Sequence, residues 1–124
     1  MSQKKIVIID DDARNIFALE ATLRAKGFVC QAFSEAEAAI KELENSDCDI
    51  ILIDMMMPEM DGYEAIPKIR QIKDKEHVPI IAVTAQAMHG DKEKCLAAGA
   101  NDYISKPIDV DRLLSVLKEQ LTEH

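Results

Sequence analysis

The chain has 124 residues, of which 48% are hydrophobic and 31% charged, so it is long enough for one domain and too apolar for a disordered segment. Its net charge is −8 and no more than two basic residues adjoin, which argues against binding of nucleic acid or of an anionic membrane by this domain. Three scattered cysteines, no 18-residue apolar run and no signal peptide predict a cytoplasmic protein with reduced thiols.

Strands and helices are expected to alternate along the chain. Apolar runs rich in β-branched residues predict strands over 5–9, 28–33, 48–54, 78–84 and 101–105. Apolar residues at helical spacing, bounded by caps and glycines, predict helices over 13–26, 35–45, 62–72, 87–98 and 109–121. Ser34 with Glu37 is expected to form a capping box, and Pro67 is expected to cause a kink or a late start of the third helix.

Five strands alternating with five helices predict an α/β fold with a parallel sheet covered on both faces. Right-handed crossovers favour the doubly wound, flavodoxin-like strand order 2-1-3-4-5. In this order the ligand crevice lies at the carboxyl edge between strands 1 and 3. No internal repeat or linker interrupts the chain, so residues 1–124 are expected to form a single domain.

Acidic residues stand at the ends of the two strands that border this crevice. Asp10, Asp11 and Asp12 follow the first strand, and Asp54 ends the third. Two carboxylates about 4 Å apart repel by roughly 4 kcal/mol at an effective dielectric constant near 20, so a group of them requires a cation, a lysine or protonation. A hard cation such as Mg²⁺ (or Mn²⁺) suits an all-oxygen site that also holds a phosphate. One such acid alone would be an ordinary solvated loop residue.

The loop after the first strand excludes a direct phosphate cradle. Nucleotide and flavin sites place glycines and backbone N–H groups there, whereas "DDDARN" would repel a bare phosphate. Thr84 ends the fourth strand and Lys106 follows the fifth, so a hydroxyl and an ammonium reach the same edge as the acids. Lys106 is expected to neutralise the acids at rest and to bind a phosphoryl oxygen afterwards.

These motifs resemble those of response-regulator receiver domains, the phosphoacceptor modules of bacterial two-component signalling. The resemblance covers essentially the whole chain and rests on "IIDDD", "ILIDMMMPEMDGYE", "IIAVTA" and "DYISKP". The segments "DARNIFAL" and "GDKEKCLAAGANDYISKP" are most similar to receivers of hybrid histidine kinases.

The resemblance implies a role for each residue that matches the family pattern. Asp54 would be the phosphorylated aspartate, and Asp11, Asp54 and the Met56 backbone carbonyl would bind Mg²⁺ directly, with Asp10 acting mostly through water. Asp12 would occupy the variable next position. Thr84 and Lys106 would be the hydroxyl and the lysine of the conformational switch. Met56 and Gln86 would influence the lifetime of the phosphate. The resemblance also implies a cis peptide bond before Pro107.

The implied function is Mg²⁺-dependent phosphoryl transfer from a phosphohistidine of a histidine kinase or phosphotransfer domain. The domain would promote its own phosphorylation and dephosphorylation and would not be a stand-alone enzyme. Thr84 would then bond the phosphoryl group and Tyr103 would rotate inward, which would change the surface of 87–98, 101–105 and 109–121. This surface would bind a partner or form a homodimer. Alternatively, Tyr103 is a half-buried edge aromatic with a solvated hydroxyl.

The sequence argues against two other functions. A haloacid-dehalogenase-like phosphatase also forms an aspartyl phosphate on a Mg²⁺ site, but it needs a second acid two residues after the nucleophile, where this chain has Met56. A receiver-like binding module that is never phosphorylated would be marked by loss of an acid, the threonine or the lysine, and none is missing.

Overall fold

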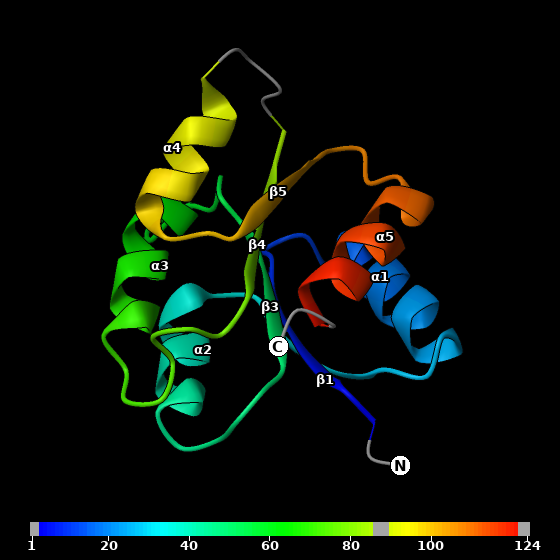
Figure 1. Cartoon of the computed structure of the whole chain (residues 1–124), viewed down its shortest axis with the longest axis horizontal. Coiled ribbons are helices and arrows are strands. Elements are labelled where there is room, and N and C mark those ends of the chain that lie inside the picture. Colours follow the sequence, from blue (N-terminus) through cyan, green and yellow to red (C-terminus); the bar gives the residue numbers. More distant parts are fainter. Residues whose placement is uncertain (1–2, 86–89, 122–124) are drawn as a thin grey trace.

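The computed structural model describes residues 3–85 and 90–121, which form an α/β fold around a five-stranded parallel sheet (Figure 1). The strands are β1 (Lys5–Ile9), β2 (Val29–Phe33), β3 (Ile50–Asp54), β4 (Ile80–Thr84) and β5 (Asp102–Ser105). Their spatial order is β2-β1-β3-β4-β5, and each neighbouring pair is parallel. The predicted flavodoxin-like topology is therefore confirmed.

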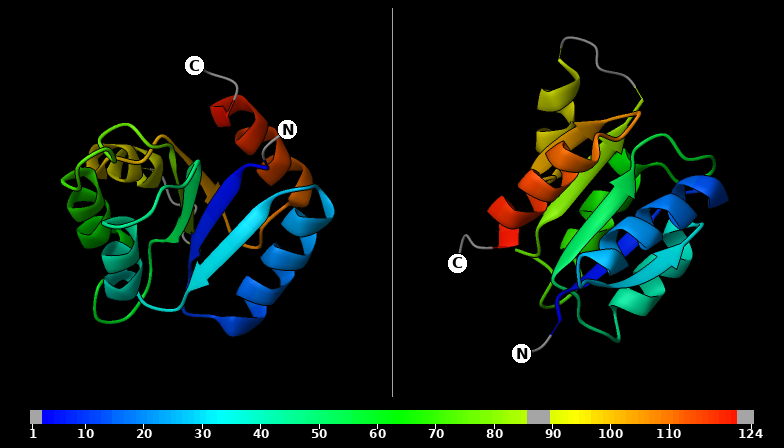
Figure 2. Two further views of the ribbon diagram at one scale, coloured as in Figure 1. Left: turned by 90° about the horizontal axis from the view of Figure 1, so that it is seen from below. Right: turned by 90° about the vertical axis from the view of Figure 1, so that its right-hand side faces the viewer.

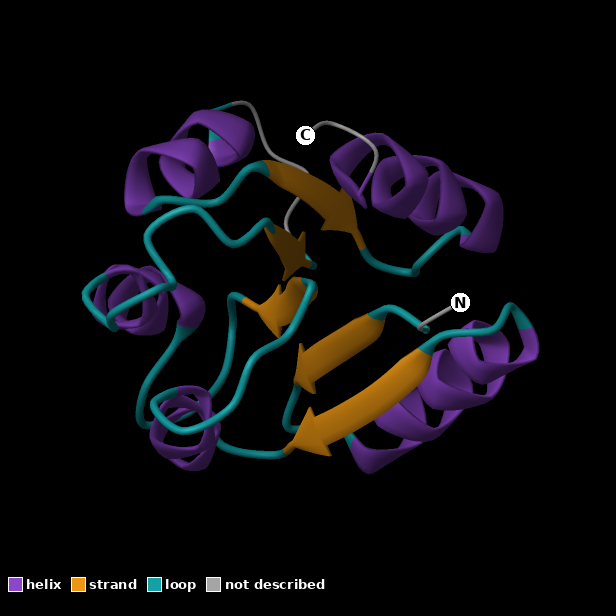
Figure 3. Ribbon diagram, turned by 60° about the horizontal axis from the view of Figure 1, so that its bottom comes forward, coloured by secondary structure: helices purple, strands orange, loops and turns teal. Residues whose placement is uncertain are grey.

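Five helices cover the sheet on both faces. They are α1 (Ala13–Ala25), α2 (Ala36–Leu43), α3 (Gly62–Arg70), α4 (Asp91–Ala98) and α5 (Val110–Leu121). Helices α1 and α5 lie on one face and α2, α3 and α4 on the other, so the fold has three layers (Figures 2 and 3). Within the described residues, no helix combines the length and the apolar character that crossing a bilayer requires.

The sheet divides the hydrophobic core into two clusters. Alternate residues of each strand point to opposite faces, and both faces are buried, which explains why the strands read as unbroken apolar runs. The α2–α4 side receives Val7, Ile9, Ile51, Ile53, Ile80 and Ala82 from the strands. The α1–α5 side receives Ile6, Ile8, Ile50, Leu52, Ile81 and Ile104.

Several elements begin later than the sequence predicted. Strand β2 starts at Val29 because the N–H of Phe28 donates to the carbonyl of Leu23 and closes the end of α1. Strand β4 starts at Ile80, directly after Pro79, which has no N–H to donate to a ladder. Part of the predicted 87–98 helix falls on residues 86–89, outside the described residues; the observed α4 begins at Asp91.

The predicted capping box at the start of α2 is wrong. The helix begins one residue later than expected, with Glu35 as its N-cap and no side-chain hydrogen bond at the cap. Ser34 is therefore one peptide too far from the first turn to accept from its free N–H groups. The position that a capping box on Glu35 would need is occupied by Ala38, which has no group to return a hydrogen bond.

Of the two effects predicted for Pro67, a kink or a late start of α3, the late start is excluded. The helix begins at Gly62, directly after Asp61, whose Oδ1 accepts a hydrogen bond from the N–H of Glu64 at 3.0 Å. Pro67 lies inside the helix and is exposed. The lost backbone hydrogen bond is offset by an opposite face of α3 that is fully buried against the core, formed by Ala65, Ile66 and Ile69.

Candidate functional site

Three carboxylates meet at the carboxyl edge of the sheet. One oxygen from each of Asp10, Asp11 and Asp54 lies within 4.8 Å of the others. Strands β1 and β3 pair with Ile9 opposite Ile53, so the residues that follow emerge side by side. Asp10 and Asp54 are only 2% and 4% exposed, whereas Asp11 is exposed. The predicted convergence of acids from two strand ends is therefore observed.

Asp10 is fixed by donors from the loop and from α1. Its Oδ1 accepts from the N–H of Asp12 at 2.9 Å, and its Oδ2 accepts from the amide of Asn15. The ammonium of Lys106 lies 3.7 Å from the same Oδ2. Burial nevertheless raises the pKa of Asp10 above its ordinary value, against the opposing effect of these donors. Ionisation of Asp10 is therefore unfavourable in the protein without a cation, and a bound cation would favour it.

Asp54 is held through both of its oxygens. The N–H of Met56 donates to Oδ1 at 2.9 Å, and the Lys106 ammonium donates to Oδ2 at 3.1 Å. Burial alone would lower the pKa of Lys106, but its hydrogen bond to Asp54 and the charges of the three acids raise it above the ordinary value. Lys106 is thus a permanent cation beside a carboxylate whose plane is fixed.

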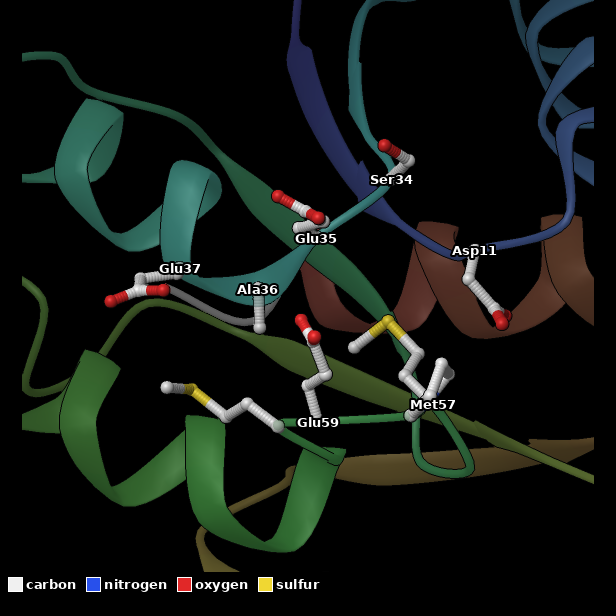
Figure 4. A pocket seen from close by; sticks show the side chains of 9 residues that line it. Asp11, Ser34, Glu35, Ala36, Glu37, Met57 and Glu59 are labelled. Carbon is white, nitrogen blue, oxygen red and sulfur yellow. The ribbon is translucent and has the colours of Figure 1, made fainter.

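Asp11 lines an open pocket next to this group. The pocket has a volume of about 330 Å³ and lies between the loops that follow β1, β2 and β3. Figure 4 shows Asp11 on one side of it, with the carboxylates of Glu35, Glu37 and Glu59 on the other. The approach to Asp11 is therefore strongly acidic, which favours entry of a cation over entry of a free anion.

Thr84 lies at the same edge and is 1% exposed. Its hydroxyl donates to Oδ2 of Asp91 at 3.1 Å. The predicted switch residue Tyr103 is half-buried and packs against the core cluster on the α2–α4 side. Gln86, for which the resemblance implied a role in phosphate lifetime, lies outside the described residues.

The start of α3 packs closely against the loop that follows Asp54. The Met56 side chain is 51% exposed, while Met55 is fully buried. A Cβ atom on Gly62 would lie 2.3 Å from the sulfur and 2.9 Å from the Cα of Met55, so only glycine fits without displacing this loop. The bond between Lys106 and Pro107 is cis, as the resemblance implied.

Two residues that contact the site were not identified from the sequence. Asn15 holds Asp10, and Asp91 accepts from Thr84. Both lie in the segments that carry the resemblance to hybrid-kinase receivers. For Asn15 a signal existed, since the first turn of α1 directly follows the strand end. For Asp91 none existed, because an acid in the first turn of a helix is ordinary.

The donor set fits a hard divalent cation. All three side chains offer carboxylate oxygens, and two of them are buried. Oxygen ligands from one or two carboxylates are what Mg²⁺ uses when it also binds a phosphate. Repulsion among the acids, which Lys106 relieves only in part, would be lowered further by such an ion.

Comparison with known proteins gives the same assignment. The family model of the response regulator receiver domain matches residues 6–118. The histidine-protein kinase BarA of Escherichia coli K12 is 37% identical over 112 residues, 90% of this chain and 12% of that protein. The heme response regulator HssR of Staphylococcus epidermidis is 34% identical over 118 residues, 95% of this chain and 51% of that protein. The chain thus spans only a part of these relatives.

Solved structures agree in fold. The receiver domain of sensor histidine kinase PA1611 of Pseudomonas aeruginosa, with a magnesium ion coordinated in its active site cleft, has a TM-score of 0.90 and 35% identity over 98% of this chain and 100% of that one. A CheY-like receiver domain protein of Methanospirillum hungatei has a TM-score of 0.89 and 30% identity over 98% of this chain and 96% of that one. The chain therefore belongs to the response regulator receiver domain family and is a receiver domain of two-component signal transduction.

Proposed function

We propose that Asp54 is the phosphoacceptor of this domain, which comprises residues 1–124. The observation that carries the proposal is the position of Asp54, between the Lys106 ammonium at 3.1 Å and two further carboxylates. A carboxylate is a weak nucleophile, so the site acts by positioning and charge. The domain is a phosphoacceptor and not a stand-alone enzyme.

In the transfer step an oxygen of Asp54 attacks the phosphorus of a phosphohistidine. The new O–P bond forms as the N–P bond breaks, and the donor imidazole leaves with the electron pair of that bond. The N–H of Met56 and the ammonium of Lys106 hold the Asp54 carboxylate in one orientation. Lys106 also contributes positive charge beside the incoming phosphoryl oxygens.

Asp10, Asp11 and Asp54 would hold Mg²⁺, together with the backbone carbonyl of Met56. When bound, the ion neutralises charge on the acids and on the phosphoryl oxygens. Mn²⁺ prefers similar oxygen ligands and is the second candidate. The magnesium ion in the PA1611 receiver supports the first choice.

The phosphoryl donor would be a histidine kinase or a histidine phosphotransfer domain in the cytoplasm. All three cysteines are free thiols, which suits a reducing compartment. Neither a membrane nor nucleic acid is a proposed partner of this domain, given its net charge of −8.

The response would involve Thr84, Tyr103 and the surface of α4, β5 and α5. Thr84 would bond a phosphoryl oxygen, and Tyr103 would rotate inward. The changed surface would bind a partner or a second copy of the chain. Met56 and Gln86 would set the lifetime of the phosphate, with Gln86 orienting water because the Met56 thioether is a poor hydrogen-bond partner.

The test is uptake of phosphate from acetyl phosphate in the presence of Mg²⁺. Asp54→Asn is expected to abolish acid-labile phosphate, which mass spectrometry of the intact protein detects. Asp61→Asn is the matched control, because Asp61 lies in the same loop and asparagine caps a helix as well as aspartate does. Undiminished uptake by Asp54→Asn would place the acceptor elsewhere. No uptake by the unsubstituted chain would favour the unphosphorylated binding module.

A further inference from the structure

The Thr84 hydroxyl belongs to a buried hydrogen-bonded group that joins three elements. Thr84 ends β4, Asp91 is the first residue of α4, and Tyr63 lies in the first turn of α3. Thr84 donates to Oδ2 of Asp91 at 3.1 Å, and the Tyr63 hydroxyl donates to Oδ1 at 3.2 Å. Asp91 is only 7% exposed, so each carboxylate oxygen has a hydroxyl donor and little water.

A hydroxyl has one hydrogen and can donate it to one acceptor at a time. In the structure that acceptor is a buried carboxylate, and hydrogen bonds to charged groups are stronger than those between neutral groups. Thr84 can therefore donate to a phosphoryl oxygen on Asp54 only after its bond to Asp91 breaks. Asp91 competes with the phosphoryl group for the same hydrogen.

We propose that Asp91 is a positioning residue that retains the Thr84 hydroxyl in the unphosphorylated state, so that Asp91 sets how easily the domain changes to its phosphorylated conformation. The inference rests on the proposed role of Thr84 as the residue that bonds the phosphoryl group. It adds a residue on α4 whose action is exerted through Thr84 and not through the metal or the phosphate.

The hydrogen bond from Thr84 to Asp91 also links the end of β4 to the start of α4. The N-cap of α4 is Gly90, which has no side chain to cap the helix. When Thr84 turns to the phosphoryl group, Asp91 loses its bond to β4 and keeps the bond to Tyr63 on α3. The Tyr63 hydroxyl stays protonated, because burial raises its pKa, and Cys95 and Asp91 shift it in the same direction. Of the two hydrogen bonds that the Asp91 carboxylate makes among the described residues, the one to Tyr63 of α3 then remains.

The experiment measures the affinity of beryllofluoride, an analogue of the phosphoryl group, at saturating Mg²⁺ by calorimetry. Asp91→Ala removes the competing acceptor and is expected to tighten binding by roughly tenfold, the lower end of the value of a hydrogen bond to a charged group. Asp91→Asn keeps a neutral acceptor and is expected to tighten binding by roughly threefold, since a neutral bond is weaker. The Asp91→Asn variant also allows the test if the Asp91→Ala variant does not fold.

A double-mutant cycle separates positioning from a merely structural role. In a Thr84→Val background there is no hydroxyl to retain, so Asp91→Ala is expected to leave the beryllofluoride affinity unchanged. Tyr63→Phe is the matched control: it removes the other donor to Asp91 and leaves the Thr84 contact, so binding is expected not to tighten. Mg²⁺ affinity without beryllofluoride is expected to be equal in all these variants.

Two results would overturn the inference. One is a beryllofluoride affinity that Asp91→Ala leaves unchanged or weakens. The other is an equal effect of Asp91→Ala with threonine and with valine at position 84. Failure of the unsubstituted chain to bind beryllofluoride with Mg²⁺ would instead refute the proposed function.

Discussion

The substitution Asp10→Asn tests how much the charge of Asp10 lowers the free energy of unfolding when no Mg²⁺ is bound. The repulsion between Asp10 and Asp54 is at least about 3.5 kcal/mol, since their closest oxygens lie within 4.8 Å and an effective dielectric constant of about 20 applies. Exposed Asp11 adds about 1 kcal/mol at the dielectric constant of water. Lys106, 3.7 Å away, attracts Asp10 by about 4.5 kcal/mol at the lower dielectric constant. For Asp10 the attraction by Lys106 therefore does not exceed the repulsion by the other two acids.

The cost of burying the Asp10 charge then decides the outcome. Asparagine keeps an acceptor for the N–H of Asp12, and the Asn15 amide can reverse to accept from the new amide. We therefore expect Asp10→Asn to raise the free energy of unfolding by about 1 to 2 kcal/mol without Mg²⁺. The raised pKa of Asp10 agrees with this expected gain in stability, because it means that the folded protein disfavours the ionised form.

The assay is urea unfolding followed by circular dichroism, with and without Mg²⁺. Mg²⁺ is expected to stabilise the unsubstituted chain by mass action and to stabilise Asp10→Asn less, so that the difference shrinks or reverses. Asp12→Asn is the control, because it makes the same chemical change at an exposed N-cap where asparagine is equally suitable. A loss of stability by Asp10→Asn in Mg²⁺-free buffer, without a loss by Asp12→Asn, would show that burial of the Asp10 charge is not the dominant cost.

Two further predictions concern cations on opposite sides of the fold. Arg70 donates to the backbone carbonyls of Gly99, Val78 and Lys75 and to the Asn101 side chain, so Arg70→Met is expected to lower the free energy of unfolding by about 2 to 4 kcal/mol. Lys68→Met, which breaks only an exposed ion pair with Glu64, is expected to cost less than about 0.5 kcal/mol in the same urea titration. For Lys106 the folded pKa lies above the ordinary 10.5, so its contribution is complete below that pH and is lost as pH rises through the folded value. Lys106→Met is expected to flatten the decline of stability as the pH rises above 10.5, whereas Lys4→Met, at an exposed position, is not; equal slopes in the two variants would contradict the expected contribution of Lys106.

The sheet and the acidic group were predictable because both follow from the order of strands. Once β1 and β3 are neighbours, Asp10 and Asp54 must emerge side by side, and the continuous apolar runs identify the strands without reference to contacts. Lys106 and Thr84 follow by the same rule. Their arrival at one edge required only the topology.

Contacts that depend on side-chain direction were not predictable. The start of α2 shifted by one residue and Ser34 lost its expected role, since cap geometry depends on where the chain leaves β2. Asp91 is buried because its helix packs beside Tyr63 of α3, and this tertiary contact leaves no trace in the local sequence. Helical spacing indicates which residues share a face, but it does not say which neighbour that face contacts.

The fit of Gly62 against Met55 links Asp54, the proposed phosphoacceptor, to the absence of a side chain eight residues later in the chain. A methyl group there would meet the Cα and the sulfur of Met55, which precedes the Met56 N–H that donates to the Asp54 carboxylate, so this part of the loop would have to shift. The size of residue 62 is thus limited by the loop geometry that the proposed phosphoryl transfer requires, although residue 62 takes no part in that transfer.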